Sequence, residues 1–514
     1  MNGFQNVHIR VNDKSTGKPT PVRIRFLGPG GESEAPFGRV RYLGEHTRHE
    51  LQAEGNVLLP DPRQGVYGTK AFAYIDGTCE IELPVGQLEV EIDKGPEYVP
   101  LVTTANLPQG KLAMRFEIER WTNFREKRWY SGDTHCYDIS PHGALLEGGG
   151  EDLAVVNLLA REEHQGESFH IPNMLAFSGQ RPCVSNEDYM VVVNTRNESE
   201  LGCLALLNCH RPVFPLNFED RNGLHLWNVA DWCEQCHRKR GLVVALEFFN
   251  QVLRLQGNIE APFPDAGELL ADAILGHIDT IDLDGGASDA MWPWLDLLSA
   301  GFRIPLSGGS GKCSVEQRLG DVRTYAQLLP GEDFDYKNWI EAVRAGRTFV
   351  TNGPLLTLTV DGCVPGEVLD VTESRRVAIE CQAEGLVSFD KLQVFWNHEL
   401  IGNVTVTEDG LIYRATWNEE FPIDQPGFFY ARCTGGQGNV VEPGFAHTSP
   451  IYVQMQGNVW KPNVDAVDRL RNFVDLSLCW VRENGKFETE QQYERMAAIY
   501  QAAQAVLDER RKQG

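Results

Sequence analysis

The spacing of apolar side chains changes twice along this chain, and these changes limit the folds that it can adopt. Residues 5–120 alternate apolar with polar side chains, which is the period of a half-buried strand. Residues 125–352 place short apolar runs between amphipathic stretches of helical period. Residues 355–455 return to alternation, and residues 463–511 follow a helical pattern. Strand-rich, mixed and helical parts therefore follow one another in a single chain.

These parts predict a multidomain α+β fold, because 514 residues exceed what one hydrophobic core usually holds. The two alternating parts are typical of β-sandwiches, and the repeated βα units between them indicate a parallel sheet, closed or open. A break at Asn484-Gly485 indicates that the helical part is a hairpin. We expect an N-terminal β-sandwich, a central distorted βα barrel, a C-terminal β-sandwich and a helical hairpin, at residues 1–122, 123–352, 353–456 and 457–514.

The chain is strongly acidic, with a formal net charge of −25 at pH 7. Such a surface repels phosphate backbones and anionic lipids, so we expect neither nucleic acid nor a membrane as a partner. The first ten residues contain no apolar run of the kind found in signal peptides. We therefore expect a cytoplasmic protein, although a chain whose leader had been removed would look the same. A small-molecule ligand and a homo-oligomer are both compatible with this composition.

The densest polar cluster is the stretch DTHCYD at residues 133–138. It offers two carboxylates and the imidazole of His135, which are the oxygen and nitrogen donors that divalent metals prefer. A polar turn after a strand is the simpler interpretation, and composition alone favours it. If the site is functional, Asp133 would orient His135 from outside the metal's own ligand shell.

Other polar residues lie where strands are expected to end. Glu247 directly follows the apolar run at residues 242–246. A lone buried carboxylate is costly, so Glu247 belongs either to a site or to an ion pair with an arginine. The glycine-rich stretch SGGSGK at residues 307–312 lacks the spacing of a P-loop. It still allows the backbone to approach a ligand closely, and Lys312 would neutralise an anion there.

Several segments, taken in order, resemble the CehA/McbA-type metallohydrolases of the PHP superfamily, and the match runs through most of the chain. The residues that carry the resemblance are TGKPTPVR at 16–23, WYSGDTH at 129–135, EDL at 151–153, NLLA at 157–160, IPLSGG at 304–309 with Lys312, VRTYA at 322–326 and AVRAGRTFV at 342–350.

The resemblance implies a PHP-type barrel that holds one or more divalent metal ions (Zn, Mn or Mg) and hydrolyses an ester, amide or phosphoester with metal-bound hydroxide. Among the implied ligand positions, His135 and Glu151 or Asp152 are retained. At the other positions the implied ligand is replaced. Tyr137 stands for the second histidine of the opening motif, and Arg196 and Cys203 lie in the next pair of strands. Glu247 stands for a later histidine, and Gly311 for an aspartate of the glycine-rich loop. A positive charge at position 196 would repel a metal ion.

Two hypotheses follow from this depleted ligand set. In the first, the metal site is degenerate and its metal chemistry is lost or altered. The barrel then provides a ligand-binding or non-classical hydrolase pocket, or acts as a structural or regulatory partner. In the second, the chain is an active metal-dependent hydrolase with a rebuilt ligand set of His135, Glu151 and Glu247, which suits Mn or Mg. In either case the catalytic candidates are His135, Asp133 and Lys312, and the substrate-binding candidates are Tyr137, Arg196 and Arg323.

A third hypothesis is a metal-free carbohydrate-binding or carbohydrate-active protein. Tryptophans can stack on sugar faces, and four lie in the middle part of the chain: Trp227, Trp232, Trp292 and Trp294. Glu247 with Asp282 or Asp284 would then form the carboxylate pair of glycoside chemistry. Core packing is the more common use of tryptophan, so this hypothesis ranks below the other two.

Overall fold

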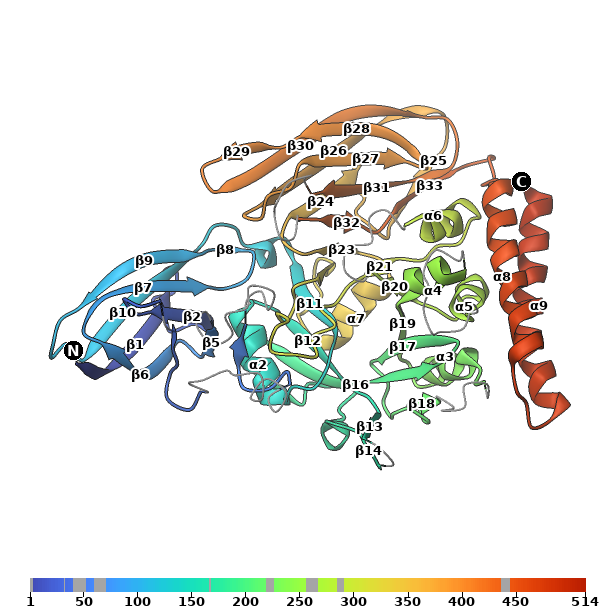
Figure 1. The fold of residues 1–514 in the computed structure, drawn as a ribbon. Coiled ribbons are helices and arrows are strands. Elements are labelled where there is room, and N and C mark those ends of the chain that lie inside the picture. The colour runs from blue at the N-terminus through green and yellow to red at the C-terminus, as the bar shows by residue number, and fades with distance from the viewer. Residues whose placement is uncertain are drawn as a thin grey trace. The chain divides into compact units, whose positions relative to one another are not determined.

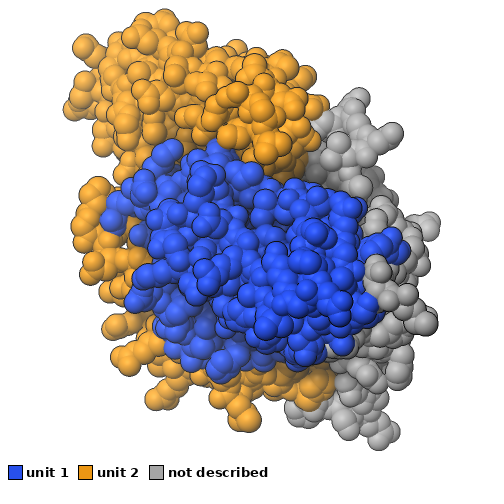
Figure 2. All heavy atoms as spheres, turned by 90° about the vertical axis from the view of Figure 1, so that its left-hand side faces the viewer, with its two compact units in different colours: residues 1–158, 182–193, 309–323 blue, residues 159–181, 194–308, 324–514 orange. Residues whose placement is uncertain are grey.

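The computed structural model describes residues 3–31, 33–39, 52–59, 71–165, 168–218, 226–255, 267–283, 291–435 and 444–514. The chain divides into two compact units, which Figure 2 distinguishes by colour. Unit 1 comprises residues 1–158, 182–193 and 309–323, and unit 2 comprises residues 159–181, 194–308 and 324–514. Strands in several sheets and α-helices both contribute (Figure 1), so the prediction of a mixed α and β fold is confirmed.

Unit 1 begins with two sheets that share one core. The first sheet has the order β6-β1-β10-β8, and the second has the order β4-β5-β2-β7-β9 with β3 beside β2. Alternate residues of β1 and β2, among them Val7, Ile9, Ile24 and Phe26, enter the same buried cluster. The strands are β1 (Phe4–Asp13), β2 (Val22–Leu27), β3 (Ser33–Glu34), β4 (Val57–Leu58), β5 (Phe72–Ile75), β6 (Thr78–Pro84), β7 (Gly86–Asp93), β8 (Tyr98–Val99), β9 (Leu101–Leu107) and β10 (Ala113–Arg120).

A β–α–β element follows in unit 1. Helix α2 (Pro141–Gly150) connects β11 (Trp129–Cys136) to β12 (Val155–Ala160), and the two strands pair in parallel. Ser140 caps the helix by accepting a hydrogen bond from the Gly143 backbone, and proline occupies the first turn, where no amide donor is needed. The 3-10 helix η2 (Phe124–Lys127) precedes β11, and β15 (Val184–Ser185) also lies in this unit.

Unit 2 contains the remaining βα repeats. Strand β19 pairs in parallel with β20, and β20 pairs in parallel with β21. However, β17 is antiparallel to both β16 and β19, so the described sheet is mixed rather than all parallel. The elements that lie wholly or mostly in this unit are β13 (Glu163–Gln165), β14 (Ser168–His170), η3 (Met174–Ala176), β16 (Met190–Ser199), β17 (Gly202–Leu207), β18 (Asn217–Phe218), α3 (Val229–Arg238), β19 (Leu242–Leu246), α4 (Phe248–Leu255), α5 (Leu269–Leu275), β20 (Thr280–Asp282), α6 (Trp292–Ser299), β21 (Leu306–Ser307), β22 (Arg323–Gln327) and α7 (Tyr336–Arg344).

The strand expected at residues 303–307 forms only at Leu306–Ser307. Pro305 lacks an amide donor, so it cannot supply a ladder hydrogen bond at that position. The predicted parallel βα pairs are thus present, while a closed barrel of PHP type stays a prediction for the described residues.

The C-terminal strands of unit 2 form two layers. One layer is a separate four-stranded sheet, and the other consists of β25, β27, β28, β31, β32 and β33, which continue through β23 the sheet that contains the βα repeats. The four-stranded sheet has the order β24-β26-β30-β29, and β26 pairs with β30 along its whole length. The buried residues include Leu358 and Ile379 from this sheet and Val394 and Phe429 from the other layer. The strands are β23 (Thr348–Thr351), β24 (Leu355–Val360), β25 (Val368–Val371), β26 (Arg375–Gly385), β27 (Lys391–Trp396), β28 (Glu399–Thr405), β29 (Thr407–Asp409), β30 (Ile412–Ile423), β31 (Gly427–Thr434), β32 (Ala446–Thr448) and β33 (Ile451–Met455).

The last part of unit 2 is a helical hairpin. Helices α8 (Val464–Asn484) and α9 (Glu490–Gln513) lie side by side (Figure 1), and the break between them is at the predicted position. Thr489 and Gln492 form a capping box at the start of α9, which satisfies two backbone donors. Among the helices of the described residues, none combines the length and the apolar character needed to cross a membrane.

Helix α9 packs against α5 through Tyr500, which is fully buried. Within the described part of the chain, the Tyr500 hydroxyl has no hydrogen-bond partner, and the same holds for Oε2 of Glu268 and Oδ2 of Asp272. Burial raises the pKa of Tyr500, and the charges of Glu268 and Asp272 raise it further. The hydroxyl therefore contributes a desolvation cost to this contact, while the ring contributes apolar burial.

We predict that Tyr500→Phe leaves the free energy of unfolding unchanged or raises it by up to about 1 kcal/mol, because it removes an unpaired buried hydroxyl. Tyr500→Ala should lower it by about 3 to 5 kcal/mol, because it leaves a cavity under α9. Denaturant unfolding followed by circular dichroism measures both values. A Tyr500→Phe variant that loses 2 kcal/mol or more would mean that the hydroxyl makes a stabilising hydrogen bond.

Candidate functional site

The end of β11 carries the polar cluster that the sequence analysis singled out. Asp133 lies opposite Val156 of β12 and Cys136 lies opposite Leu158, with a register shift between these two pairs. A turn was the simpler expectation here, but the strand continues through Cys136. All residues from 131 to 136 are buried, and buried backbone groups need the partners that a strand ladder supplies.

Asp133 is a fully buried acceptor that holds this strand end to the glycine-rich loop. Its Oδ1 accepts hydrogen bonds from the backbone amides of His135 and Ser310, both at 3.0 Å. Its Oδ2 accepts from the Ser310 hydroxyl at 2.5 Å and from the Gly320 amide at 2.9 Å. Burial raises the pKa of the Asp133 carboxyl, and the charge of His135 and these hydrogen bonds act in the opposite direction. In this arrangement Asp133 is a positioning residue, since it orders the backbone around His135.

The His135 ring lies in a cradle built from glycine. Its Nδ1 is 3.3 Å from the Thr134 hydroxyl. A Cβ on Gly309 would lie 2.6 Å from Nδ1, so no larger residue fits at that position without a shift. A Cβ on Gly311 would lie 3.5 Å from Nε2, which is ordinary contact distance. An aspartate at 311, as the resemblance implies, would therefore place its carboxyl beside the imidazole, and this chain has no side chain there.

Tyr137 stands where the resemblance implies a second histidine. Its side chain is buried, and its ring centroid lies 5.9 Å from that of His135. Its backbone amide donates to the Lys312 carbonyl at 2.7 Å, and the Gly311 amide donates to the His135 carbonyl at 3.1 Å. The glycine-rich loop thus continues the ladder beyond the end of β11.

Lys312 is fully buried, and an internal carboxylate neutralises it. Its ammonium lies 3.3 Å from Oε2 of Glu147 and donates to the carbonyls of Ser314 at 3.0 Å and Gln317 at 2.8 Å. The two carbonyls take two of the three ammonium donors, and the Glu147 carboxylate lies within ion-pair distance without accepting a hydrogen bond among the described residues. The anion that Lys312 neutralises is therefore Glu147 of α2, a residue that the sequence analysis did not identify. No motif marks it, because its role follows from helix packing.

Glu151 is fully buried and faces arginines. Its Oε1 accepts hydrogen bonds from Arg23 and from the Tyr74 hydroxyl, the latter at 2.8 Å. The Nε of Arg318 lies 4.0 Å from Oε2. Arg323, a substrate-binding candidate, donates to the Glu151 carbonyl at 2.8 Å. These residues form a neutralising network around Glu151.

Asp152, the alternative to Glu151, is likewise paired. It lies 2.8 Å from Arg120 and 3.2 Å from Arg125, and it accepts a hydrogen bond from the Tyr189 hydroxyl at 3.1 Å. Burial would raise the pKa of Asp152, but Arg125 and Arg120 hold it below its usual value.

The remaining candidates lie in unit 2. Arg196 is 2.7 Å from Glu198 and 3.2 Å from Glu247. An ion pair with an arginine is one of the two roles that the sequence left open for Glu247. Glu247 has a positive φ of 57°, an unusual conformation for a residue other than glycine. Its side chain is 41% exposed, so solvent reaches it. Burial raises the pKa of the neighbouring Cys203, against the charge of Arg196.

The structure thus gathers six candidates in unit 1 and two in unit 2, at Asp133, His135, Tyr137, Glu151, Lys312 and Arg323, and at Arg196 and Glu247. Within the described ranges, no group of three or more His, Cys, Asp or Glu side chains is arranged to hold a metal ion. The two carboxylates that the sequence assigned as metal ligands, Glu151 and Glu247, each pair with an arginine.

The four tryptophans of the carbohydrate hypothesis have different environments. Trp232 and Trp294 are fully buried, and Trp294 donates to the Ile304 carbonyl at 2.8 Å. Trp227 packs against Phe218 and Trp292 against Phe473, with ring centroids 5.1 and 5.3 Å apart. Asp282 is buried in β20, and Asp284 lies outside the described residues.

No protein-family model, curated protein or solved structure matches this chain in comparisons with known proteins. The resemblance to the CehA/McbA-type metallohydrolases therefore stays a prediction that its motifs carry.

The Glu147–Lys312 pair makes a prediction about pH. Burial raises the pKa of Glu147 from 4.5 to about 7, although Lys312 lowers it. The folded protein therefore binds a proton that the unfolded chain has released, and this stabilisation is present below pH 4.5 and lost as the pH rises through 7. We predict that the free energy of unfolding of the wild type, relative to Glu147→Gln, falls by about 3 kcal/mol between pH 4.5 and 8.

Denaturant unfolding at four or five pH values measures this difference. Glu119→Gln is the matched control, because Glu119 is exposed and pairs with the exposed Lys14. Curves for the wild type and Glu147→Gln that stay parallel across this range would show that Glu147 is ionised in the folded protein throughout.

Proposed function

We propose that this chain is a PHP-type relative of the metallohydrolases whose metal site is degenerate, and that it binds a small-molecule ligand rather than generating metal-bound hydroxide. One observation carries the proposal. Each carboxylate assigned as a metal ligand already pairs with an arginine, Glu151 with Arg23 and Glu247 with Arg196.

Charge is the physical reason. A divalent cation brought to Glu151 would lie close to the guanidinium of Arg23, which is also buried. Breaking a buried pair to admit the cation would leave an uncompensated charge, at a cost of about 3 to 5 kcal/mol. The residues present at this position therefore do not fit the metal cluster that the resemblance implies.

The surroundings of His135 support the same proposal. Zinc sites in proteins use four ligands, or three ligands and a water. Beside His135, Tyr137 stands in place of the second histidine that the resemblance implies, and Gly311 stands in place of the aspartate. Asp133 already accepts hydrogen bonds from backbone amides and a hydroxyl. His135 then acts as a hydrogen-bonding group in a site lined by tyrosine and glycine.

A hydrolase with a rebuilt ligand set is the second candidate, and the backbone at Glu247 favours it. Non-glycine residues in the left-handed region cost about 1 kcal/mol or more, and they gather at functional sites. Glu247 combines this conformation with partial exposure. In this candidate His135, Glu151 and Glu247 would hold Mn or Mg, which carboxylates suit.

The metal content of the purified protein tests the two candidates. After growth and dialysis with added Zn and Mn, we predict much less than one equivalent of either metal per chain, with no difference between the wild type and His135→Ala. Elemental analysis by mass spectrometry measures this content. One equivalent that disappears in both His135→Ala and Glu247→Ala would contradict the proposal and support the rebuilt ligand set.

A restoring variant sharpens the test. Tyr137→His combined with Gly311→Asp returns two of the implied ligands to positions beside His135. A gain of bound metal in this variant alone is expected if substitution emptied the site.

A further inference from the structure

Two adjoining cavities of unit 2 are lined by residues other than the candidates above. Their volumes are about 380 and 360 Å³, within the usual range for small-molecule sites. They share a common wall made of Pro426, Phe428, Asn458, Val459 and Trp460. We call the pair the Trp460 cavity.

The lining of the Trp460 cavity is cationic in an acidic protein. Arg303 and Arg510 line one half, Lys461 lines the other, and neither lining includes an aspartate or glutamate. Among the described residues, no carboxylate lies within ion-pair distance of any of these three cations. The whole chain has 72 acidic and 47 basic residues. Composition alone would therefore predict acidic residues in the lining of the Trp460 cavity as well.

The neighbours of Arg510 make the contrast clear. Arg511 lies 2.8 Å from Asp468, and Lys512 lies 3.4 Å from Glu509. Arg510 instead lies over the ring of Phe302, with its guanidinium carbon 5.3 Å from the ring centroid. Of these three basic residues, Arg510 lines the cavity, and among the described residues it alone of the three has no carboxylate partner.

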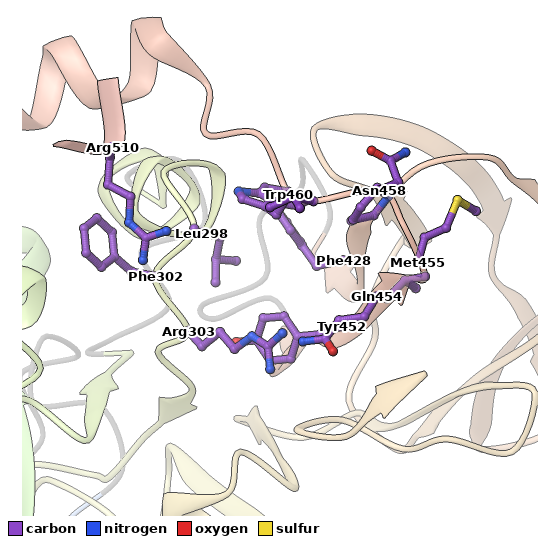
Figure 3. A pocket seen from close by; sticks show the side chains of 15 residues that line it. Leu298, Phe302, Arg303, Phe428, Tyr452, Gln454, Met455, Asn458, Trp460 and Arg510 are labelled. Carbon is purple, nitrogen blue, oxygen red and sulfur yellow. The ribbon is translucent and has the colours of Figure 1, made fainter. Parts of the chain in front are cut away.

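Aromatic rings hold both guanidiniums in place. Arg303 lies over Tyr452, 4.7 Å from the ring centroid. Stacking of this kind fixes the plane of a guanidinium while leaving its N–H groups available to a ligand. In Figure 3, Arg510 and Phe302 lie on one side of the cavity, and Arg303 and Tyr452 lie below Trp460.

Two N–H donors approach the same point above Gly301. A Cβ on this glycine would lie 3.1 Å from the Trp460 indole nitrogen and 3.3 Å from a terminal nitrogen of Arg510. The Trp460 indole nitrogen is buried and has no hydrogen-bond partner within the described part of the protein. Buried donors are usually satisfied, and an acceptor on a bound ligand would satisfy this one.

We propose that the Trp460 cavity binds a small molecule that carries a carboxylate or phosphate group on a ring. The oxyanion accepts hydrogen bonds from Arg510, Arg303 and the Trp460 indole. The ring packs between the aromatic walls formed by Phe428, Tyr452 and Trp460. Arginine suits this role because its planar fork matches the oxygens of both anions. This site is separate from the β11 end, and it does not depend on whether that position holds a metal.

Isothermal titration calorimetry in low-salt buffer tests the proposal with phenyl phosphate, benzoate and glucose 6-phosphate. We expect saturable binding of at least one of them, weakened by added salt because the contact is ionic. Comparison of the first two probes with the third tells an aromatic ring from a sugar. The neutral analogues benzamide and glucose should bind at least about tenfold more weakly, since they lack the charge that the arginines recognise.

Variants locate the binding. Arg303→Gln and Arg510→Gln should each raise the dissociation constant about tenfold or more. Arg511→Gln is the matched control on the same helix turn and should leave it unchanged, because Arg511 pairs with Asp468. Trp460→Leu should weaken binding of the ring-bearing probes more than that of inorganic phosphate. The proposal is overturned if no probe binds saturably, or if binding survives equally in Arg303→Gln and Arg510→Gln.

Discussion

The ion pair between Lys312 and Glu147 joins the glycine-rich loop to helix α2, and much of the candidate site follows from it. Both side chains are fully buried, so each charge would be costly without the other. The pair fixes the loop that reaches back to β11, where the loop's amides and the Ser310 hydroxyl meet Asp133. His135 is held by this backbone arrangement, since its amide donates to Asp133 and its carbonyl accepts from Gly311.

Under the proposed function, the same constraint explains how a chain derived from a metallohydrolase keeps its shape while its ligand positions change. A metal ion is one way to neutralise carboxylates that converge at strand ends. In this chain arginines and a lysine provide the neutralisation: Arg23 at Glu151, Arg120 and Arg125 at Asp152, and Lys312 at Glu147. On this proposal, one cause explains both the substituted ligands and the paired carboxylates: basic side chains supply the positive charge that a metal ion would bring.

Much of the fold could be predicted from the period of the apolar residues. The alternation in β1 and β2, the buried run of β19, and the helix break at Asn484-Gly485 are all local signals. The end of β11 was harder, because its polar residues suggested a turn. They are buried in the strand, where partners distant in sequence satisfy them: Ser310 is 177 positions from Asp133.

Site residues were predictable by type and less so by role. Asp133, Lys312 and Glu151 were singled out by residue type, and each is buried with polar or charged partners. Their actual partners, such as Glu147 and Arg23, follow no motif, because packing of separate elements chooses them. Arg303, Trp460 and Arg510 carried no signal either, since each is an ordinary residue in its own segment and only the fold brings the three to one cavity.

The Trp460 cavity also bears on how this chain could be divided. Its walls come from the segment after α6, from strands β31 and β33, from the connection at Trp460 and from the last turns of α9. A C-terminal sandwich inherited or cloned by itself would keep Tyr452 and Phe428 but neither Arg303 nor Arg510. Recombination at the sandwich boundaries would therefore separate the two guanidiniums from the rings. The cavity could be inherited only together with the segments on both sides of the sandwich.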